Sequence, residues 1–166
     1  MKKYLFAFVF IFSSIVAFSQ EESTTYYLIR HAEKVRSDAS NKDPHLTKKG
    51  HNRASYWAMV FSTVQFDKVF TTKYHRTIQT ANPTAKSQGL SMEYYDPRKM
   101  YDENFQNATK GKTVLVVGHS NTTPFFANKI LGKNTYKEIE DNNNNNLYII
   151  TVTKSSKTGV LLKVVY

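Results

Sequence analysis

The sequence predicts an α/β protein, a three-layer sandwich in which helices cover both faces of a mostly parallel sheet. Strand-like and amphipathic helical segments alternate along a chain of 166 residues, which is the size of one domain. The segment 113–117 is apolar without alternation, as in a central strand that is covered on both faces. Two further apolar segments, joined by a polar turn that contains Gly159, predict an antiparallel C-terminal hairpin.

Residues 1–19 have the features of a secretory signal peptide. A basic start precedes an apolar segment at 4–18, and small residues follow at the spacing that a signal peptidase recognises. The segment is shorter than the ~20 apolar residues of a membrane-spanning helix, which argues against an uncleaved anchor. We expect cleavage near Ser19-Gln20, a mature domain at 20–166, a secreted or periplasmic location, and no stable membrane anchor after cleavage.

The first half of the chain predicts two units of strand and helix. Segment 24–29 is rich in β-branched and aromatic residues, which favours a strand. Thr47 is a favourable N-cap, and apolar residues recur after it at three- and four-residue spacing as far as Phe61, which indicates a helix. A second short strand lies within 67–71, and a second helix is predicted at 76–88.

The rest of the chain continues the alternation. Pro83 predicts a kink or a second start within the second helix. Five consecutive asparagines, at 142–146, predict a solvated loop. The remaining predicted elements are a strand at 92–94, a helix at 97–108, the central strand at 113–117, a helix at 122–132, and hairpin strands at 147–152 and 160–165.

The composition excludes several classes of chemistry. The chain contains no Cys, which removes disulfides, thiolate metal sites and Cys nucleophiles. It carries 23 Lys and Arg against 13 Asp and Glu, a net charge of +10 that favours anionic ligands. The lysines are scattered without a run of five like charges, so we expect no nucleic-acid partner.

Three polar motifs directly follow three of the predicted strands. They are Arg30-His31-Ala32-Glu33, the segment 73–81 with Arg76, and Gly118-His119-Ser120-Asn121. Because ligands bind beyond the carboxyl ends of parallel strands, we expect the motifs to meet at one rim of the sheet. Two arginines and two histidines there predict an electropositive pocket, and guanidinium groups match phosphate oxygens in a bidentate way. An oxyanion such as phosphate is therefore the predicted ligand.

The same residues favour phosphoryl transfer over metal binding. A zinc site would need His31, His119 and a third ligand, while the neighbouring Arg30 and Arg76 would repel a dication. A neutral imidazole can instead attack phosphorus and form a phosphohistidine intermediate. The arginines and the second imidazole would stabilise the charge on the phosphoryl oxygens. We expect neither a metal ion nor a cofactor.

In this order, the three motifs resemble those of the histidine phosphatase superfamily, which has the phosphoglycerate-mutase-like fold. Ala32 and the stretch Asp-Pro-x-Leu-Thr-x-x-Gly at 43–50 resemble its small phosphohistidine-phosphatase-type members. One short motif is a weak signal, but three in order at strand ends are specific together. The resemblance covers nearly all of 20–166 and implies a histidine phosphatase domain there.

The resemblance also implies a role for each matching residue. His31 is the implied catalytic nucleophile, which is transiently phosphorylated. The implied phosphate pocket consists of Arg30, Arg76 and the second catalytic imidazole, His119. Asn121 is implied to support this pocket.

The residue that protonates the leaving group stays open between two carboxylates. Larger members take a Glu from an insertion that this chain does not have. The candidates here are Glu33, close to the nucleophile, and Asp96, in the 94–97 loop. Glu33 is equally explained as a salt-bridge partner of Arg30 or Lys34. A phosphohistidine nitrogen or an acidic phenol would need little protonation as it leaves.

We therefore expect an exported, metal-independent phosphatase that hydrolyses phosphomonoesters or phosphohistidine through a phosphohistidine intermediate on His31. Its partner would be a small-molecule or protein-borne phosphate. The alternative is a catalytically weak or silent member of the same fold that binds a phosphorylated ligand. A mutase is disfavoured, because a domain of this length has little room for the extra segments that enclose a bisphosphate.

Overall fold

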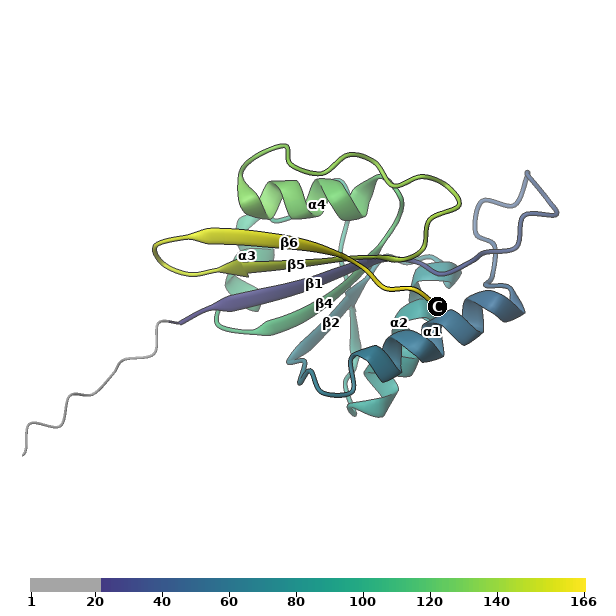
Figure 1. Ribbon diagram of the computed structural model, residues 1–166, viewed down its shortest axis with the longest axis horizontal. Coiled ribbons are helices and arrows are strands. Elements are labelled where there is room, and N and C mark those ends of the chain that lie inside the picture. Colours follow the sequence, from purple (N-terminus) through teal and green to yellow (C-terminus); the bar gives the residue numbers. More distant parts are fainter. Residues whose placement is uncertain (1–21) are drawn as a thin grey trace, which may run out of the picture.

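The computed structural model describes residues 22–166, which form a six-stranded sheet with helices on both faces (Figure 1). The predicted signal segment at 1–19 lies outside these described residues. The elements in chain order are β1 (Thr24–Arg30), α1 (Lys48–Val60), β2 (Lys68–Thr71), α2 (His75–Ser87), β3 (Met92–Tyr94), α3 (Glu103–Thr109), β4 (Thr113–Gly118), α4 (Thr122–Leu131), β5 (Asn146–Val152) and β6 (Lys157–Lys163). Within this part of the chain, no helix combines the length and the apolarity needed to cross a bilayer.

The strand order is β3-β2-β4-β1-β5-β6, and it confirms the predicted α/β fold. The strands β3, β2, β4 and β1 are parallel to one another, and β5 pairs antiparallel with β1. The strands β5 and β6 pair antiparallel at one edge, which is the predicted C-terminal hairpin. The strand β4 lies between β2 and β1 and is buried from its second residue onward, as its unbroken apolar sequence predicts.

Two hydrophobic layers hold the helices against the sheet. Because side chains alternate between the faces of a strand, Leu28 and Ile29 of β1 belong to different layers. Helices α1 and α2 cover one face, where Trp57 packs in the same cluster as Ile29. Helices α3 and α4 cover the other face, where Phe105 and Phe126 pack with Leu28. Figure 1 shows α4 and the α1–α2 pair on opposite sides of the sheet.

Three predicted element boundaries need correction. Helix α2 is a single helix that includes Pro83, so the predicted second start is wrong. Helix α3 begins only at Glu103, because Asp102 caps it by accepting a hydrogen bond from Phe105 N at 2.9 Å. Strand β6 begins at Lys157, three residues before the predicted start, because the hairpin turn is short.

The predicted loop at 142–146 is present as far as Asn145, but the predicted solvation is wrong beyond the exposed Asn142. Asn144 and Asn146 are only 7% and 8% exposed, and β5 already begins at Asn146. Asn144 Nδ2 donates to the carbonyl of His31 at 2.8 Å, and Asn146 Nδ2 donates to the Tyr148 hydroxyl at 3.0 Å. These bonds make burial of the amides possible, because a buried polar group is costly only when it has no partner. The stretch is therefore a packed connection that reaches the predicted site.

Candidate active site

The strand order brings the three sequence motifs to one edge of the sheet. Strands β2, β4 and β1 are adjacent and parallel, so their carboxyl ends meet there. Arg30 pairs with Gly118 in register, and His31 N donates to the carbonyl of Gly118 at 2.9 Å. The rings of His31 and His119 consequently lie with their centroids 5.5 Å apart. Residues 88 positions apart in sequence thus become neighbours through strand pairing alone.

A cleft of about 380 Å³ opens at this edge. Five of the seven predicted site residues line it: Arg30, His31, Arg76, His119 and Asn121. The other two, Glu33 and Asp96, line neighbouring clefts. The lining also includes Lys34, Tyr74 and Glu138, to which the motifs assigned no role.

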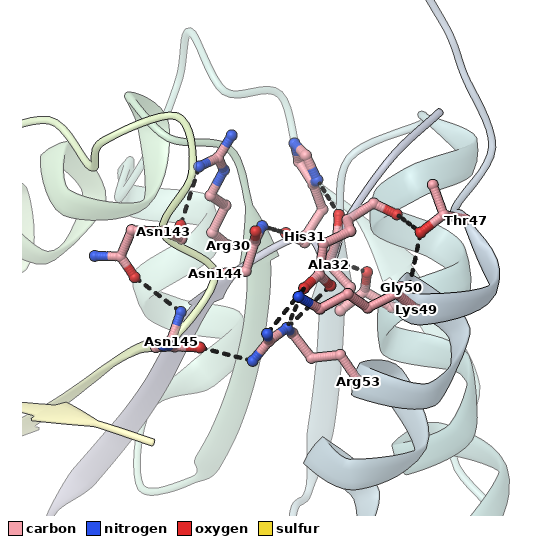
Figure 2. Close-up of polar contacts among 12 residues, drawn as sticks. Arg30, His31, Ala32, Thr47, Lys49, Gly50, Arg53, Asn143, Asn144 and Asn145 are labelled. Atoms are coloured by element: carbon pink, nitrogen blue, oxygen red, sulfur yellow. Dashed lines mark hydrogen bonds and ion pairs between the residues drawn. The ribbon is translucent and has the colours of Figure 1, made fainter. Parts of the chain in front are cut away.

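His31 is buried at the base of the cleft with its ring orientation fixed. Only 3% of the residue is exposed, and its Nδ1 lies 2.7 Å from the carbonyl oxygen of Ala32. Figure 2 shows this contact. A carbonyl oxygen only accepts hydrogen bonds, so Nδ1 carries the proton and Nε2 has a free lone pair. Burial, together with the charges of Arg30 and Arg76, lowers the pKa of His31 to about 3. The ring is therefore neutral at physiological pH, and Nε2 is the ring nitrogen with a free lone pair.

His119 is the second neutral imidazole of the cleft. Its Nε2 lies 3.0 Å from the Thr72 hydroxyl at the end of β2. The ring of Tyr74 packs against it edge to face, with centroids 5.2 Å apart. Burial and then the charge of Arg76 lower the pKa of His119 to about 4.

Arg76, in the first turn of α2, supplies positive charge to the cleft. Its guanidinium stacks on the Tyr74 ring at 4.3 Å from the centroid. Its NH1 donates to the Lys42 carbonyl at 3.2 Å and lies 3.7 Å from Asp43 Oδ1. Its Nε is buried without a hydrogen-bond partner among the described residues. Because an arginine at a helix N-terminus opposes the helix dipole, this position favours a role in anion binding.

Arg30 is mostly engaged with the chain before β5. It is 3% exposed, and its NH1 donates to the carbonyls of Glu140, Asp141 and Asn143 at 2.9, 3.0 and 3.0 Å. Figure 2 shows the bond to Asn143. Its NH2 donates to Asp141 Oδ1 at 2.9 Å, and Arg36 binds the same carboxylate. The Nε of Arg30 is buried and has no partner in the described part of the chain. Arg30 therefore organises the 140–143 loop and keeps one N–H unpaired.

The beginning of α4 lies at the rim of the cleft and is tied to His119. Its N-cap Asn121 is exposed and accepts a hydrogen bond from Thr122 N at 2.8 Å. His119 N donates to the Thr122 hydroxyl at 3.1 Å, and Thr123 N donates to the His119 carbonyl at 3.0 Å. The positive end of the helix dipole consequently lies beside the two imidazoles.

The polar residues of the second motif join α2 to the loop that follows β1. The Thr80 hydroxyl accepts a hydrogen bond from Ala32 N at 2.9 Å and donates to the Arg76 carbonyl at 2.7 Å. The Thr77 hydroxyl donates to the Thr72 carbonyl at 3.0 Å, which holds the end of β2. The segment 73–81 was predicted to lie beside the motif at 30–33, and the Thr80 hydroxyl makes that contact.

Glu33 is held by cations of α1 rather than by Arg30 or Lys34. Both of its carboxylate oxygens accept from Arg53 Nε at 3.0 Å, and Lys49 lies 3.7 Å away. Burial acts to raise the pKa of Glu33, but the hydrogen bonds from Arg53 and the backbone, together with the charges of Arg53 and Lys49, lower it. Arg53 also donates to Asn145 Oδ1 at 2.7 Å (Figure 2). The carboxylate is therefore ionised and links α1 to the active-site loop.

Asp96 is likewise paired with an arginine. It accepts hydrogen bonds from Arg98 Nε at 3.0 Å and NH2 at 2.9 Å. These hydrogen bonds lower the pKa of Asp96 to about 2. Asp96 lines a neighbouring cleft together with Tyr94 and Pro97, and it does not line the cleft of His31 and His119.

The sequence motifs did not predict that Asn144 and Glu138 contribute to the site. Asn144 binds the backbone of His31, although the run of asparagines is typical of a loop. Glu138 lines the His31 cleft and accepts a hydrogen bond from Ser120 at 3.4 Å. Both residues precede β5, whose antiparallel return to β1 carries them to the site. No local pattern predicts that contact, because it depends on which strand β5 pairs with.

Comparison with known proteins relates this architecture to one superfamily. Residues 26–97 match the histidine phosphatase superfamily (branch 1), and that segment contains the first two motifs. No curated protein sequence matches.

Several solved structures have the same fold as this chain. The protein histidine phosphatase SixA complexed with tungstate is similar with a TM-score of 0.66 and 17% identity, over 84% of this chain and 96% of that one. Bacillus stearothermophilus YhfR is similar with a TM-score of 0.66 and 16% identity, over 86% of this chain and 98% of that one. Phosphoglycerate mutase from Bacillus anthracis str. Sterne is similar with a TM-score of 0.65 and 14% identity, over 86% of this chain and 93% of that one. This chain is therefore similar to the histidine phosphatase superfamily over residues 26–97, and it shares the fold of these solved structures.

Proposed function

We propose that this protein is a metal-independent phosphatase that forms a phosphohistidine intermediate on His31. The observation that carries the proposal is the hydrogen bond from His31 Nδ1 to the Ala32 carbonyl, which leaves Nε2 as the reactive atom. His119 and the cation Arg76 line the same cleft and would stabilise charge on the phosphoryl oxygens. The substrate is a small-molecule or protein-borne phosphate.

The reaction has two displacements at phosphorus. In the first, Nε2 of His31 attacks, the P–N bond forms, and the bond from phosphorus to the leaving group breaks with its electron pair. In the second, water attacks phosphorus, the P–N bond breaks, and the proton of the water passes to solvent. Inorganic phosphate leaves and His31 returns to its neutral state.

The test compares purified protein with the His31→Ala variant on an aryl phosphate in the presence of EDTA. We expect phosphate release by the parent protein and a loss of about 10³-fold or more in kcat for the variant. His51→Ala, which removes an exposed histidine of α1, is the matched control and should keep its activity. Substrate should also label the parent protein with acid-labile, base-stable phosphate. Comparable turnover by His31→Ala would remove His31 from its role.

One observation favours the alternative of a silent phosphate-binding member. Both predicted proton donors, Glu33 and Asp96, are paired with arginines and ionised. A leaving group that needs protonation would then leave slowly. The alternative holds if the protein binds phosphate or tungstate with Arg76-dependent affinity but neither turns over nor becomes labelled with any phosphate ester.

We also propose that the protein is exported, on the basis of the basic and apolar pattern at 1–19. The test is the N-terminal sequence of the protein recovered after expression of the full chain in a bacterium. Export predicts a mature chain that starts near Gln20 outside the cytoplasm. A chain that keeps residues 1–19 inside the cytoplasm would contradict it.

A further inference from the structure

A second cleft, of about 640 Å³, adjoins the cleft of His31 and has two lining residues, Tyr74 and Pro97, in common with it. We propose that this second cleft, here called the aryl cleft, binds the leaving group of the substrate and that this group is a phenolic ring. The substrates would be aryl phosphates, which include phosphotyrosine. The inference rests on the proposed function and adds a substrate class to it.

Contact through Tyr74 makes the two clefts continuous. The Tyr74 ring packs on His119 at 5.2 Å and beneath the Arg76 guanidinium at 4.3 Å, so it borders the phosphate position. The same ring lines the aryl cleft. The leaving group of a phosphate ester bound at His31 would therefore lie next to the aryl cleft.

The aryl cleft offers flat aromatic surface. Tyr74 and Tyr94 are 39% and 51% exposed, so their rings do not pack in the core and are free to contact a ligand. Tyr74 follows β2 and Tyr94 ends the neighbouring strand β3. Pro97 lines both clefts. Aromatic side chains stack on or pack edge to face with another ring, and they bind an aliphatic chain less specifically.

The charges of the aryl cleft favour an anion. Asp96 and Arg98 neutralise each other as a bidentate pair. Lys73 lies over the Tyr94 ring, with Nζ at 5.7 Å from the centroid, and has no carboxylate within 4.0 Å in the described part of the chain. The cleft therefore has one unbalanced positive charge beside its aromatic wall, which favours the negative charge of a departing phenolate.

The carboxylates around the two clefts explain why a phenol fits better than an alcohol. Asp96 and Asp141 are paired with arginines, Glu138 accepts a hydrogen bond from Ser120, and Glu33 accepts from Arg53. The arginine contacts favour the ionised carboxylates of Asp96, Asp141 and Glu33, which have no proton to donate. A phenol has a pKa of about 10 and leaves as phenolate without protonation, whereas an alkoxide requires a donor.

The balanced reaction is then simple. The P–N bond to His31 forms as the phosphorus–phenolic oxygen bond breaks, and the phenolate leaves with the electron pair and takes a proton from water. Water next attacks the phosphohistidine, and the products are a phenol and inorganic phosphate.

The test compares kcat/KM for phenyl phosphate, a phosphotyrosyl peptide, glycerol phosphate and phosphoimidazole. We expect both aryl substrates to exceed glycerol phosphate by about 10²-fold or more, because no donor assists the alkoxide. Preference for the peptide over phenyl phosphate indicates a protein-borne source, and the reverse indicates a small molecule. Equal or better hydrolysis of glycerol phosphate or phosphoimidazole would overturn the inference while the proposed function stands.

The variant Tyr94→Leu tests the aryl cleft itself. We expect kcat/KM for the aryl substrates to fall about three- to tenfold, with glycerol phosphate unaffected. Phe125→Leu is the matched control, because Phe125 is 48% exposed on α4 and lines a different cleft. An equal loss on all substrates, or no loss, would overturn the inference.

A binding experiment separates this inference from the proposed function. Benzylphosphonate should bind the parent protein more tightly than methylphosphonate, and Tyr94→Leu should remove the difference. If no ester is hydrolysed but this preference is present, the proposed function fails and the aryl cleft is supported as a binding site. Equal binding of the two phosphonates would overturn the aryl cleft.

Discussion

The protonation state of His31 depends on its immediate surroundings. Burial lowers the pKa of His31 to about 3 and that of His119 to about 4, against about 6.5 for a free histidine. A buried neutral imidazole beside two guanidinium groups is a poor base toward water but retains its lone pair for phosphorus. The same environment that keeps His31 neutral therefore makes the fold sensitive to acid.

Stability should fall as the pH drops below about 6.5. Below that pH the unfolded chain protonates His31 and His119, whereas the folded chain does not until about pH 4 or lower. Their contribution to stability is therefore complete above pH 6.5 and is lost as the pH falls, by up to about 1.4 kcal/mol per pH unit for each histidine. Urea unfolding at pH 7, 6 and 5 measures this slope. His31→Gln should flatten it and His51→Gln should not, and an unchanged slope in His31→Gln would contradict the buried neutral ring.

The role of Glu33 can be separated from that of a proton donor. The carboxylate is paired with Arg53, which is 5% exposed, so Glu33→Gln leaves a buried cation with a weaker partner. We expect a loss of about 1–3 kcal/mol in unfolding free energy with little change in kcat for an aryl phosphate. Asp96→Asn, in a solvent-screened pair with Arg98, is the comparison and should lower the unfolding free energy less than Glu33→Gln does. A large drop in kcat with normal stability for Glu33→Gln would instead identify Glu33 as the proton donor.

At the scale of elements, close packing of α1 and α2 against the loop after β1 positions His31. A Cβ at Gly50 would collide with the Glu33 carbonyl oxygen, so glycine lets α1 approach that loop. Thr47 caps α1 by accepting from Gly50 N at 3.0 Å and also donates to the same Glu33 carbonyl at 3.3 Å. Helix α2 contributes Thr80, which binds Ala32 N. The backbone around His31 is therefore held from both helices.

Two threonines of α2, one turn apart, provide a matched test of this link. Thr80→Val leaves the buried Ala32 N–H without an acceptor, so we expect a loss of about 1–3 kcal/mol in stability and a lower kcat. Thr84 is buried with no partner for its hydroxyl among the described residues, so Thr84→Val should be neutral or stabilising. Equal effects of the two variants on stability and kcat would contradict the positioning role of Thr80. Thr80→Ser should retain the parent behaviour.

At the scale of the whole molecule, the site is formed by the end of one sheet and by one returning loop. Strands β1, β4 and β2 bring the three motifs to the same edge, and the chain before β5 closes over Arg30. The loop carries Asp141 and Asn144 to residues more than 100 positions earlier. Strand pairing thus determines both the location of the cleft and one of its walls.

Much of this arrangement was predictable because it depends on local pattern and strand direction. The apolar segment before Gly118 and the alternation of helices and strands indicate a parallel sheet, and parallel strands place their following residues at one edge. His31, His119 and Arg76 therefore come together as expected. Glu33 was placed near the nucleophile, but its partner Arg53 was not predicted, because that pairing depends on how α1 packs.

The amino-acid sequence by itself determined the order of strands and helices and the presence of two imidazoles and two guanidiniums at strand ends. Periodicity and residue type contain that information, since they act over a few neighbouring positions. Only the tertiary structure decided the proton position on His31, the engagement of Arg30 by the 140–143 loop, and the pairing of Glu33 with Arg53 and of Asp96 with Arg98. These properties depend on burial and on contacts between distant segments, and such contacts exist only after the chain has folded.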